Sequence, residues 1–239
     1  PLIAKSDVIA MLPNSGASEL FKLSQGKVFS PQYSIEAEAS FNARQMYLLG
    51  SRRVAMIFYE DVFCRKHEDA FRKSFEGEVV EALALNSLDA SALKPLVTRL
   101  SNMKVDSLYV PDVSPFLLGL RREMAKQGLA SIRTFSVFSA QLDDVLKVEG
   151  PYADGLIYSY PAIAEQNAIS YFPRLGAQLI FDAIRACRED SDCVVRHLRT
   201  GNSFDENGVL QGAIELREIR DGRFQRRGLE QPDGAKSAH

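Results

Sequence analysis

The chain has 239 residues, of which 46% are hydrophobic and 25% charged, a globular composition with enough length for one large or two small domains. Its 29 Lys and Arg against 31 Asp and Glu give a formal net charge of −2, which offers no electrostatic basis for binding nucleic acid or an anionic membrane. No apolar run reaches the roughly 20 residues that a membrane-spanning helix needs.

Residues 8–12 form a continuous apolar run that ends at Pro13, as expected of a buried parallel strand. A loop of small residues follows, and the chain then alternates between apolar runs and helical segments. The expected strands are residues 54–59, 79–85, 107–110, 132–138 and 155–158, and the expected helices are residues 36–49, 65–75, 90–103, 114–127 and 141–145. Strands followed by crossover helices predict a parallel α/β sheet.

The pattern changes after Tyr160. Apolar periodicity predicts an amphipathic helix over residues 177–188 and a shorter helix over residues 192–200. Residues 209–219 lie between two turn signals, Asn207-Gly208 and Asp221-Gly222, and predict strands of a terminal antiparallel ribbon. The polar segment 229–239 is expected to be a disordered tail.

Two of the three cysteines, Cys187 and Cys193, lie six positions apart. That separation rises about 9 Å in an unbroken helix, and a disulfide needs Cα atoms within roughly 7 Å, so a bridge requires a turn between them. A structural disulfide, two reduced thiols, and a metal site with His197 remain open interpretations. A bridge would place the protein outside the reducing cytosol. Cys64 is expected to stay an unbridged thiol.

No catalytic or cofactor motif is present: G-x-S-x-G, G-x-G-x-x-G and the P-loop are all missing. We therefore expect no enzyme, no cofactor and no metal. The histidines His67, His197 and His239 are expected on the surface, and "FDENG" at 204–208 is expected to be a turn. Glu60-Asp61 is expected to be a solvated loop end, or a partner for a ligand cation because it follows a strand.

Four loops share one position in the predicted sheet, each following the carboxyl end of a strand. They are residues 14–18, 59–63, 110–114 and 137–140. The first offers small polar groups and backbone N–H groups, and the others add aromatic rings and a carboxylate. This composition is typical of a small-molecule cleft, although these segments would also serve simply as loops of a sheet.

The order of these elements resembles a known family. The matching stretches are "VIAMLPNSGASELFKLSQGKVFSPQYSIEAEA", "RRVAMIFYEDVFCRKHEDAF", "VDSLYVPDVSPFLLGLRREMAKQGL" and "FDAIRACREDSDCVVRHLRTGNSFDENGVLQGAIELREIRDGRF". They resemble the type I periplasmic binding proteins of ABC transporters, in the branched-chain amino-acid receptor group. The individual motifs are loose, and the specificity of the resemblance lies in their order. It includes the paired cysteines and the "F-D-x-x-G" turn near the family's end.

The resemblance implies two doubly wound parallel-sheet lobes joined by a hinge, closing over a ligand in an interlobe cleft. Lobe 2 would be residues 34–159, and residues 1–33 and 160–228 would be part of lobe 1, whose N-terminal portion is missing from this sequence. The chain also departs from the family at Phe63-Cys64, where the family has an aromatic residue followed by glycine, and in a short segment at 160–171.

The implied function is that of a receptor that delivers an amino acid or similar small polar solute to the membrane component of an ABC importer, with no nucleic-acid partner. Such a receptor is periplasmic or lipid-anchored, and this chain shows no signal segment. Lobe 1 would bind the ligand carboxylate, and lobe 2 would close on the ligand with an acidic partner for its ammonium. The implied ligand-binding residues are Asn14, Ser15, Gly16, Ala17 and Ser18 in lobe 1 and Phe63, Asp112, Val113 and Phe138 in lobe 2.

Asp112 is the candidate partner of the ammonium group, and its alternative role is to cap the helix that opens near Ser114. The alternative to a receptor is a periplasmic or lipoprotein regulator that reuses the same fold for interactions and transports no solute. The missing part of lobe 1 and the short segment after Tyr160 favour this alternative slightly.

Overall fold

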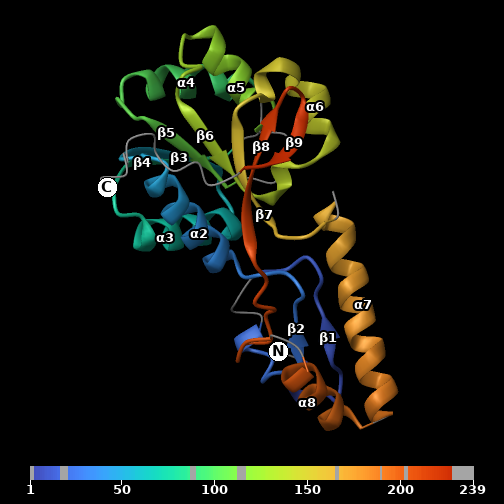
Figure 1. The fold of residues 1–239 in the computed structure, drawn as a ribbon. Helices are drawn as coiled ribbons and strands as arrows, with labels where there is room; N and C mark the ends of the chain where they lie inside the picture. Colours follow the sequence, from blue (N-terminus) through green and yellow to red (C-terminus); the bar gives the residue numbers. More distant parts are fainter. Residues whose placement is uncertain are drawn as a thin grey trace, which may run out of the picture. The chain divides into compact units, whose positions relative to one another are not determined.

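The computed structural model describes residues 3–16, 21–86, 90–111, 117–164, 167–188, 190–201 and 204–227 (Figure 1). The chain divides into two compact units: the first comprises Pro1–Glu38 and Pro161–Ile214, and the second comprises Ala39–Tyr160 and Glu215–His239. The chain therefore passes from one unit to the other three times. The tail expected at residues 229–239 lies outside the described residues.

The second unit is built on a sheet whose seven described strands lie in the order β4-β3-β5-β6-β7-β8-β9. The strands from β4 to β7 pair in parallel, and β8 and β9 form an antiparallel hairpin. The strand bounds are β3 Arg53–Tyr59, β4 Glu78–Leu85, β5 Ser107–Val110, β6 Arg133–Ser136, β7 Leu156–Pro161, β8 Ile214–Arg220 and β9 Arg223–Arg226. The predicted parallel α/β sheet is confirmed.

Helices cover both faces of this sheet, with α2 and α3 on one face and α4 and α5 on the other (Figure 1). The apolar side chains of α2 and α3 form one core cluster with Met56, Tyr109 and Phe135 of the central strands. The helix bounds are α2 Ile35–Leu48, α3 Val62–Ser74, α4 Leu93–Ser101, α5 Leu117–Lys126 and α6 Asp143–Glu149, with short 3-10 turns η2 Ala90–Ala92, η3 Phe138–Ala140 and η4 Gly150–Ala153.

The β8–β9 hairpin turns at Asp221-Gly222, whose φ angles of 52° and 64° are both left-handed. Two such residues form the type of tight turn that fits the twist of a hairpin, so the predicted antiparallel ribbon is present here. The family resemblance places residues 160–228, and with them this hairpin, in the first lobe. The hairpin instead extends the sheet of the second unit beside β7, where Gly155 N donates to Ile219 O at 2.8 Å.

The first unit contains a small parallel sheet of β1 Ala10–Met11 and β2 Val28–Phe29, with η1 Ile3–Lys5 before it. Beyond β2, Ser30 bridges in parallel to Val209. The "FDENG" segment preceding that bridge is a turn: Asp205 Oδ1 accepts from the backbone N–H groups of Asn207 and Val209, both at 2.9 Å. The predicted turn is confirmed, and Asp205 closes it with its own side chain.

Two helices complete the described part of the first unit, α7 Ala168–Cys187 and α8 Ser191–Gly201. Helix α7 begins well before the predicted residue 177, because the Asn167 side chain caps it by accepting from Ser170 N at 3.0 Å and Pro173 is accommodated inside it. Gly176 lets α7 approach β1, since a Cβ at this position would lie 2.9 Å from Met11 Cγ.

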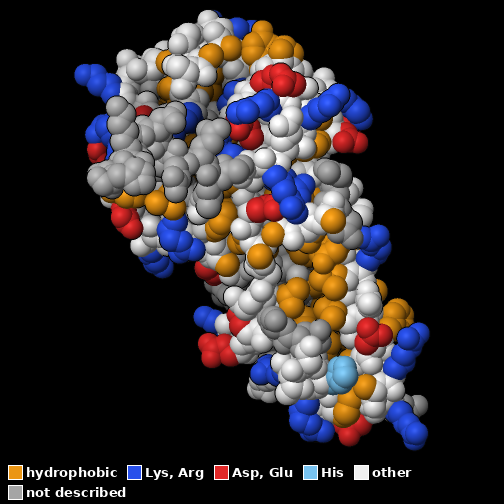
Figure 2. Space-filling model, in the orientation of Figure 1, with side chains coloured by type: hydrophobic (Ala, Val, Ile, Leu, Met, Phe, Trp, Pro, Cys, Tyr) orange, Lys and Arg blue, Asp and Glu red, His pale blue; other side chains and the backbone are white. Residues whose placement is uncertain are grey.

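Apolar side chains remain exposed along α7, and Figure 2 shows orange side chains gathered over this region. Phe181 is 62% exposed and Ile184 is 46% exposed. The helix is nevertheless no membrane span: among the described residues, no helix combines the length and hydropathy that crossing a bilayer requires.

A disulfide joins Cys187, the last residue of α7, to Cys193 in the first turn of α8, with Cα atoms 5.5 Å apart. The turn that brings them together starts at Arg188, whose φ of 58° ends α7. This confirms the disulfide among the three interpretations of the cysteine spacing. Cys64 forms no disulfide and is buried in the second unit.

We expect thiol titration of the denatured, unreduced protein to give one thiol per chain, because only Cys64 of the three cysteines lies outside the bridge. Replacing both Cys187 and Cys193 by Ser should lower the free energy of unfolding by about 2 kcal/mol, the scale for so short a closed loop. A count of three thiols would contradict the bridge.

Candidate functional site

The carboxyl ends of β3, β5 and β6 meet at one edge of the second unit's sheet, because these neighbouring strands are parallel. Ligands of open α/β sheets bind at this edge. The segment after β3 contains Glu60, Asp61 and Phe63, and the segment after β6 contains Phe138. Two residues that sequence analysis placed after β5, Asp112 and Val113, lie outside the described residues.

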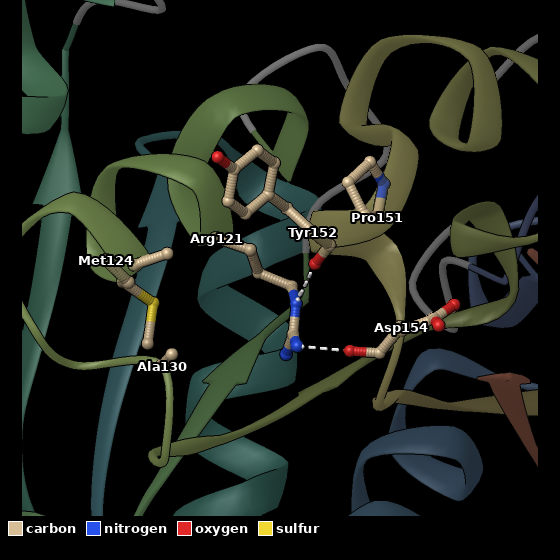
Figure 3. A pocket seen from close by; sticks show the side chains of 7 residues that line it. Arg121, Met124, Ala130, Pro151, Tyr152 and Asp154 are labelled. Carbon is tan, nitrogen blue, oxygen red and sulfur yellow. Dashed lines mark hydrogen bonds between the residues drawn. The ribbon is translucent and has the colours of Figure 1, made fainter. Parts of the chain in front are cut away.

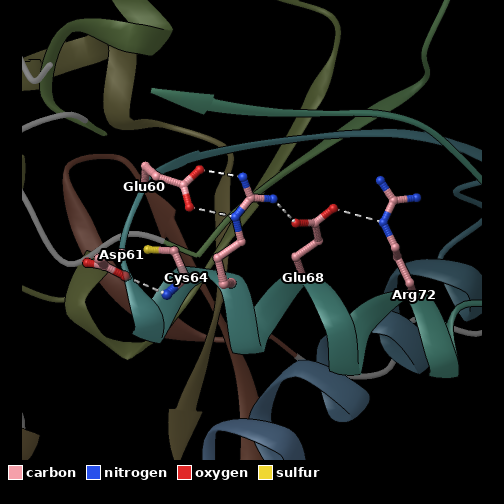
Figure 4. Close-up of polar contacts among 6 residues, drawn as sticks. Glu60, Asp61, Cys64, Glu68 and Arg72 are labelled. Atoms are coloured by element: carbon pink, nitrogen blue, oxygen red, sulfur yellow. Dashed lines mark hydrogen bonds and ion pairs between the residues drawn. The ribbon is translucent and has the colours of Figure 1, made fainter. Parts of the chain in front are cut away.

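Both carboxylates after β3 are used within the protein (Figure 4). Glu60 binds Arg65 through two contacts, one of them Arg65 Nε to Glu60 Oε1 at 2.7 Å, and this hydrogen bonding lowers the pKa of the Glu60 carboxyl. Asp61 Oδ1 caps α3 by accepting from Cys64 N at 2.7 Å. Glu60-Asp61 therefore orders the start of α3, and Asp61 acts as its N-cap.

Arg65 continues this network along α3, because its Nη1 also contacts Glu68 at 2.7 Å and Glu68 in turn contacts Arg72 at 3.0 Å (Figure 4). The two carboxylates raise the pKa of Arg65. The charges alternate along one face of the helix, at the i,i+3 and i,i+4 spacings that place side chains side by side. The first turn of α3, which presents Phe63, is thus fixed by a cap and an ion-pair ladder.

Phe63 is half-buried, and its ring packs edge-on against His67 one turn later, with centroids 4.7 Å apart. The next residue, Cys64, is buried and donates its S–H to Pro111 O at 3.1 Å. Cys64 thereby joins the start of α3 to the segment that follows β5. The family's glycine at this position could not make that contact.

His67 is fully buried, so the prediction of a surface residue was wrong. Its Nδ1 lies 3.0 Å from the Tyr109 hydroxyl, and Asn42 Nδ2 reaches the same hydroxyl at 3.3 Å and Ser159 Oγ at 3.0 Å. Burial lowers the pKa of His67 from 6.5 to about 3, so the ring is neutral at physiological pH. His67 shares helical spacing with the apolar Cys64 and Phe71, which makes it a candidate for burial, but its partner Tyr109 lies on another element that local spacing does not identify.

Phe138 is half-buried and opens the 3-10 turn η3 directly beyond β6. The residues behind it are fixed by polar contacts of Gln141, whose Oε1 accepts from Tyr158 Oη at 2.8 Å and from Arg217 Nη1 at 3.0 Å. Phe63 and Phe138 thus both lie on rigid supports that follow the carboxyl ends of strands.

In the first unit, Asn14 is exposed, Ser15 is half-buried and Gly16 is buried. Gly16 O accepts from Ile35 N at 3.3 Å, and a Cβ at Gly16 would lie 3.0 Å from that nitrogen, so the loop is packed closely against the chain before α2. Ala17 and Ser18 lie outside the described residues.

The first unit also contains an apolar cavity of about 190 Å³. Tyr33 and Phe172 line it and form an edge-to-face pair with centroids 6.2 Å apart. No charged side chain is among the residues described around this cavity. In the described part of the chain, no group of three or more His, Cys, Asp and Glu side chains is arranged to hold a metal.

No protein-family model matches the sequence, and no curated protein matches it significantly. Many solved structures, however, share the fold, and those described below are solute-binding proteins of transporters. The fold is therefore that of the type I periplasmic binding proteins, as the resemblance implied. The identities are low enough that the likeness defines the fold alone.

Three of these structures illustrate the degree of similarity and the ligands named for such proteins. A leucine-binding protein, LivK, from Thermotoga maritima has a TM-score of 0.84 at 16% identity, with 98% of this chain and 76% of that chain covered. An ABC-transporter solute-binding protein from Rhodopseudomonas palustris, in complex with p-hydroxybenzoic acid, has a TM-score of 0.80 at 21% identity, covering 96% and 73%. LivJ from Streptococcus pneumoniae, in complex with isoleucine, has a TM-score of 0.78 at 12% identity, covering 92% and 72%.

The buried state of His67 makes stability depend on pH. Above about pH 6.5 the His67 ring is neutral in both the folded and the unfolded chain. Below pH 6.5 the ring is protonated in the unfolded chain, whereas in the folded chain it stays neutral until about pH 3. The free energy of unfolding is therefore unaffected by this ring above pH 6.5 and decreases as the pH falls below that value. We expect a loss of about 2 kcal/mol between pH 7 and pH 5.

His67→Gln, which keeps a hydrogen-bonding side chain but cannot titrate, should remove this loss. Urea unfolding of wild type and variant at pH 7, 6 and 5 measures it. Equal pH dependence of the two proteins would show that His67 is not buried in the neutral form.

Proposed function

We propose that the protein is a solute-binding receptor of an ABC-type importer and not an enzyme. The observation that carries the proposal is the fold, which matches leucine-, isoleucine- and hydroxybenzoate-binding proteins over nearly the whole chain. Phe63 and Phe138 support it, because aromatic side chains on rigid supports at the carboxyl edge of a sheet suit a small organic ligand. Its partner would be the membrane component of the transporter.

We propose that the solute carries a carboxylate, the group shared by leucine, isoleucine and p-hydroxybenzoic acid in these three proteins. Asn14, Ser15 and Gly16, with Ala17 and Ser18, are the proposed carboxylate-binding loop. Phe63, Val113 and Phe138 would contact the body of the solute, and Asp112 would bind an ammonium group if the solute is an amino acid.

We also propose a periplasmic or cell-surface location. The support is the Cys187–Cys193 disulfide, because such bridges persist in oxidising compartments and are rare in the cytosol.

A thermal-shift screen of amino acids against aromatic carboxylates tests the receptor. A ligand at a hundredfold excess over its Kd should stabilise the protein by about 2.7 kcal/mol. If no member of either class raises the melting temperature, the receptor proposal fails and a non-transporting regulator with the same fold takes its place.

Asp112→Asn separates the two solute classes. It removes the charge but keeps the size and a capping oxygen, so affinity for an amino acid should fall by roughly 2 to 3 kcal/mol, the scale of a hydrogen bond between charged groups. Affinity for an aromatic carboxylate should hold, and the melting temperature of the unliganded protein should barely move. Titration calorimetry measures both affinities.

The matched control is Asp182→Asn, because Asp182 is an exposed residue of α7 whose contact with Arg185 is 3.9 Å long. It should leave both affinities unchanged. If Asp112→Asn lowers the melting temperature while amino-acid affinity holds, Asp112 is a helix cap and the ammonium binds elsewhere.

A further inference from the structure

A cavity of about 210 Å³ lies in the second unit at the amino ends of β6 and β7, the edge of the sheet opposite to Phe63 and Phe138 (Figure 3). Its walls come from three segments: Met124 and Ala125 of α5, Ala130 before β6, and Pro151 and Tyr152 before β7. These side chains are apolar or aromatic, whereas Arg121 and Asp154 add one charge of each sign to the lining. The cavity is separate from every residue assigned to the solute.

One cation, Arg121, lies at this cavity and is held by backbone alone. Its Nε donates to Tyr152 O at 2.6 Å and its Nη2 donates to Asp154 O at 2.5 Å (Figure 3). These bonds use two of the five N–H groups of a guanidinium. Among the described residues Arg121 has no ion pair, and the other N–H groups have no hydrogen-bond acceptor. The two carbonyls fix the plane of the group. The carboxylates of Glu149 and Asp154 compensate its charge only in part, because burial lowers the pKa of Arg121 more than these carboxylates raise it.

The acidic groups near Arg121, Glu149 and Asp154, attract its charge without forming an ion pair, and each accepts a hydrogen bond from another residue. The Asp154 carboxylate points away from the guanidinium in Figure 3, and its Oδ1 accepts from Gly222 N at 3.1 Å. Glu149 accepts from Gly119 N, and burial raises the pKa of its carboxyl. Arg122 adds a second cation, with its guanidinium 5.7 Å from the centre of the Tyr152 ring. Burial also lowers the pKa of Arg121, so an anion at this point would relieve a desolvated charge.

The size and chemistry of the cavity define the ligand. A cavity of about 150 Å³ holds a benzene ring, so this one admits a single ring or a short branched chain and is too small for a nucleotide. A guanidinium binds a carboxylate through two parallel N–H···O bonds. We propose that this cavity is a second binding site, for a small carboxylate whose oxygens contact Arg121 and whose apolar body packs on Met124 and Tyr152.

Sodium benzoate is the probe, and benzamide, which has the same shape but no charge, is its control. In ¹H–¹⁵N NMR titrations of the full chain, benzoate should cause saturable shifts of the amides of Ala125, Ala130 and Tyr152. Benzamide should bind at least about tenfold more weakly, because it lacks the charge that Arg121 attracts. Equal shifts with benzamide, or with sodium chloride at the same ionic strength, would overturn the proposal.

Two variants test the cavity, one by removing its cation and the other by filling its volume. Arg121→Met keeps the stem and removes the charge, and benzoate affinity should fall at least about tenfold. Ala130→Leu fills the cavity from an exposed position without touching Arg121, and should abolish the shifts while the protein stays folded. Lys126→Met is the matched control on the same helix and should change the affinity by less than about twofold, because Lys126 is exposed, contacts Glu123 at 3.6 Å and does not line the cavity.

Persistence of the shifts in both Arg121→Met and Ala130→Leu would place benzoate elsewhere and refute the site. Phe63→Ala reports on the solute site only, so it should leave the shifts at Ala125, Ala130 and Tyr152 unchanged. The two proposals therefore fail independently: a protein that binds no solute at Phe63 can still bind benzoate at Arg121, and the reverse.

Discussion

The hydroxyl group of Tyr109 is the contact on which the arrangement of the second unit depends. It lies on the central strand β5 and is reached by His67 of α3 and Asn42 of α2, and Asn42 also binds Ser159 of β7. Polar groups buried this deeply are costly unless they are paired, so the network permits one placement of the two helices over the sheet. The network also positions Phe63, because the Phe63 ring packs edge-on against His67.

Much of this arrangement follows from local sequence. Continuous apolar runs locate β3 and β5 to within one residue, since a strand buried on both faces has no polar positions. The alternation of strands with helices and the turn at Asp221-Gly222 also follow from pattern and turn chemistry. Parallel strands then place the segments containing Phe63 and Phe138 at one edge, as the sequence predicts, although their role in binding remains a proposal.

Other features lie beyond local pattern. The polar His67 interrupts an otherwise apolar helix face, and only the presence of Tyr109 and its partners makes its burial tolerable. The extent of α7 depends on a cap at Asn167 and on the accommodation of Pro173, which propensity alone disfavours. The partner of the β8–β9 hairpin is a tertiary choice, because the alternation of a strand is the same whichever sheet it joins.

Two arginines of the second unit, Arg217 and Arg121, differ in the groups that surround the same charge. Arg217 is buried with Glu215 at 2.8 Å and the Tyr160 ring at 4.0 Å, so a carboxylate and an aromatic face replace its water. Arg121 has carbonyl oxygens in place of a carboxylate. The first arrangement has an ion pair within the chain, whereas the second has none among the described residues and is the one to which we assign a carboxylate from solution.

Because the chain crosses between its two units three times, a single proteolytic cut has a limited effect on it. In a two-domain protein joined by a single linker, one proteolytic cut releases a domain. Here a cut in any one passage leaves two covalent connections, so a nicked chain would stay in one piece until denatured. Co-migration with the intact protein on a native gel is therefore no proof of an uncut polypeptide.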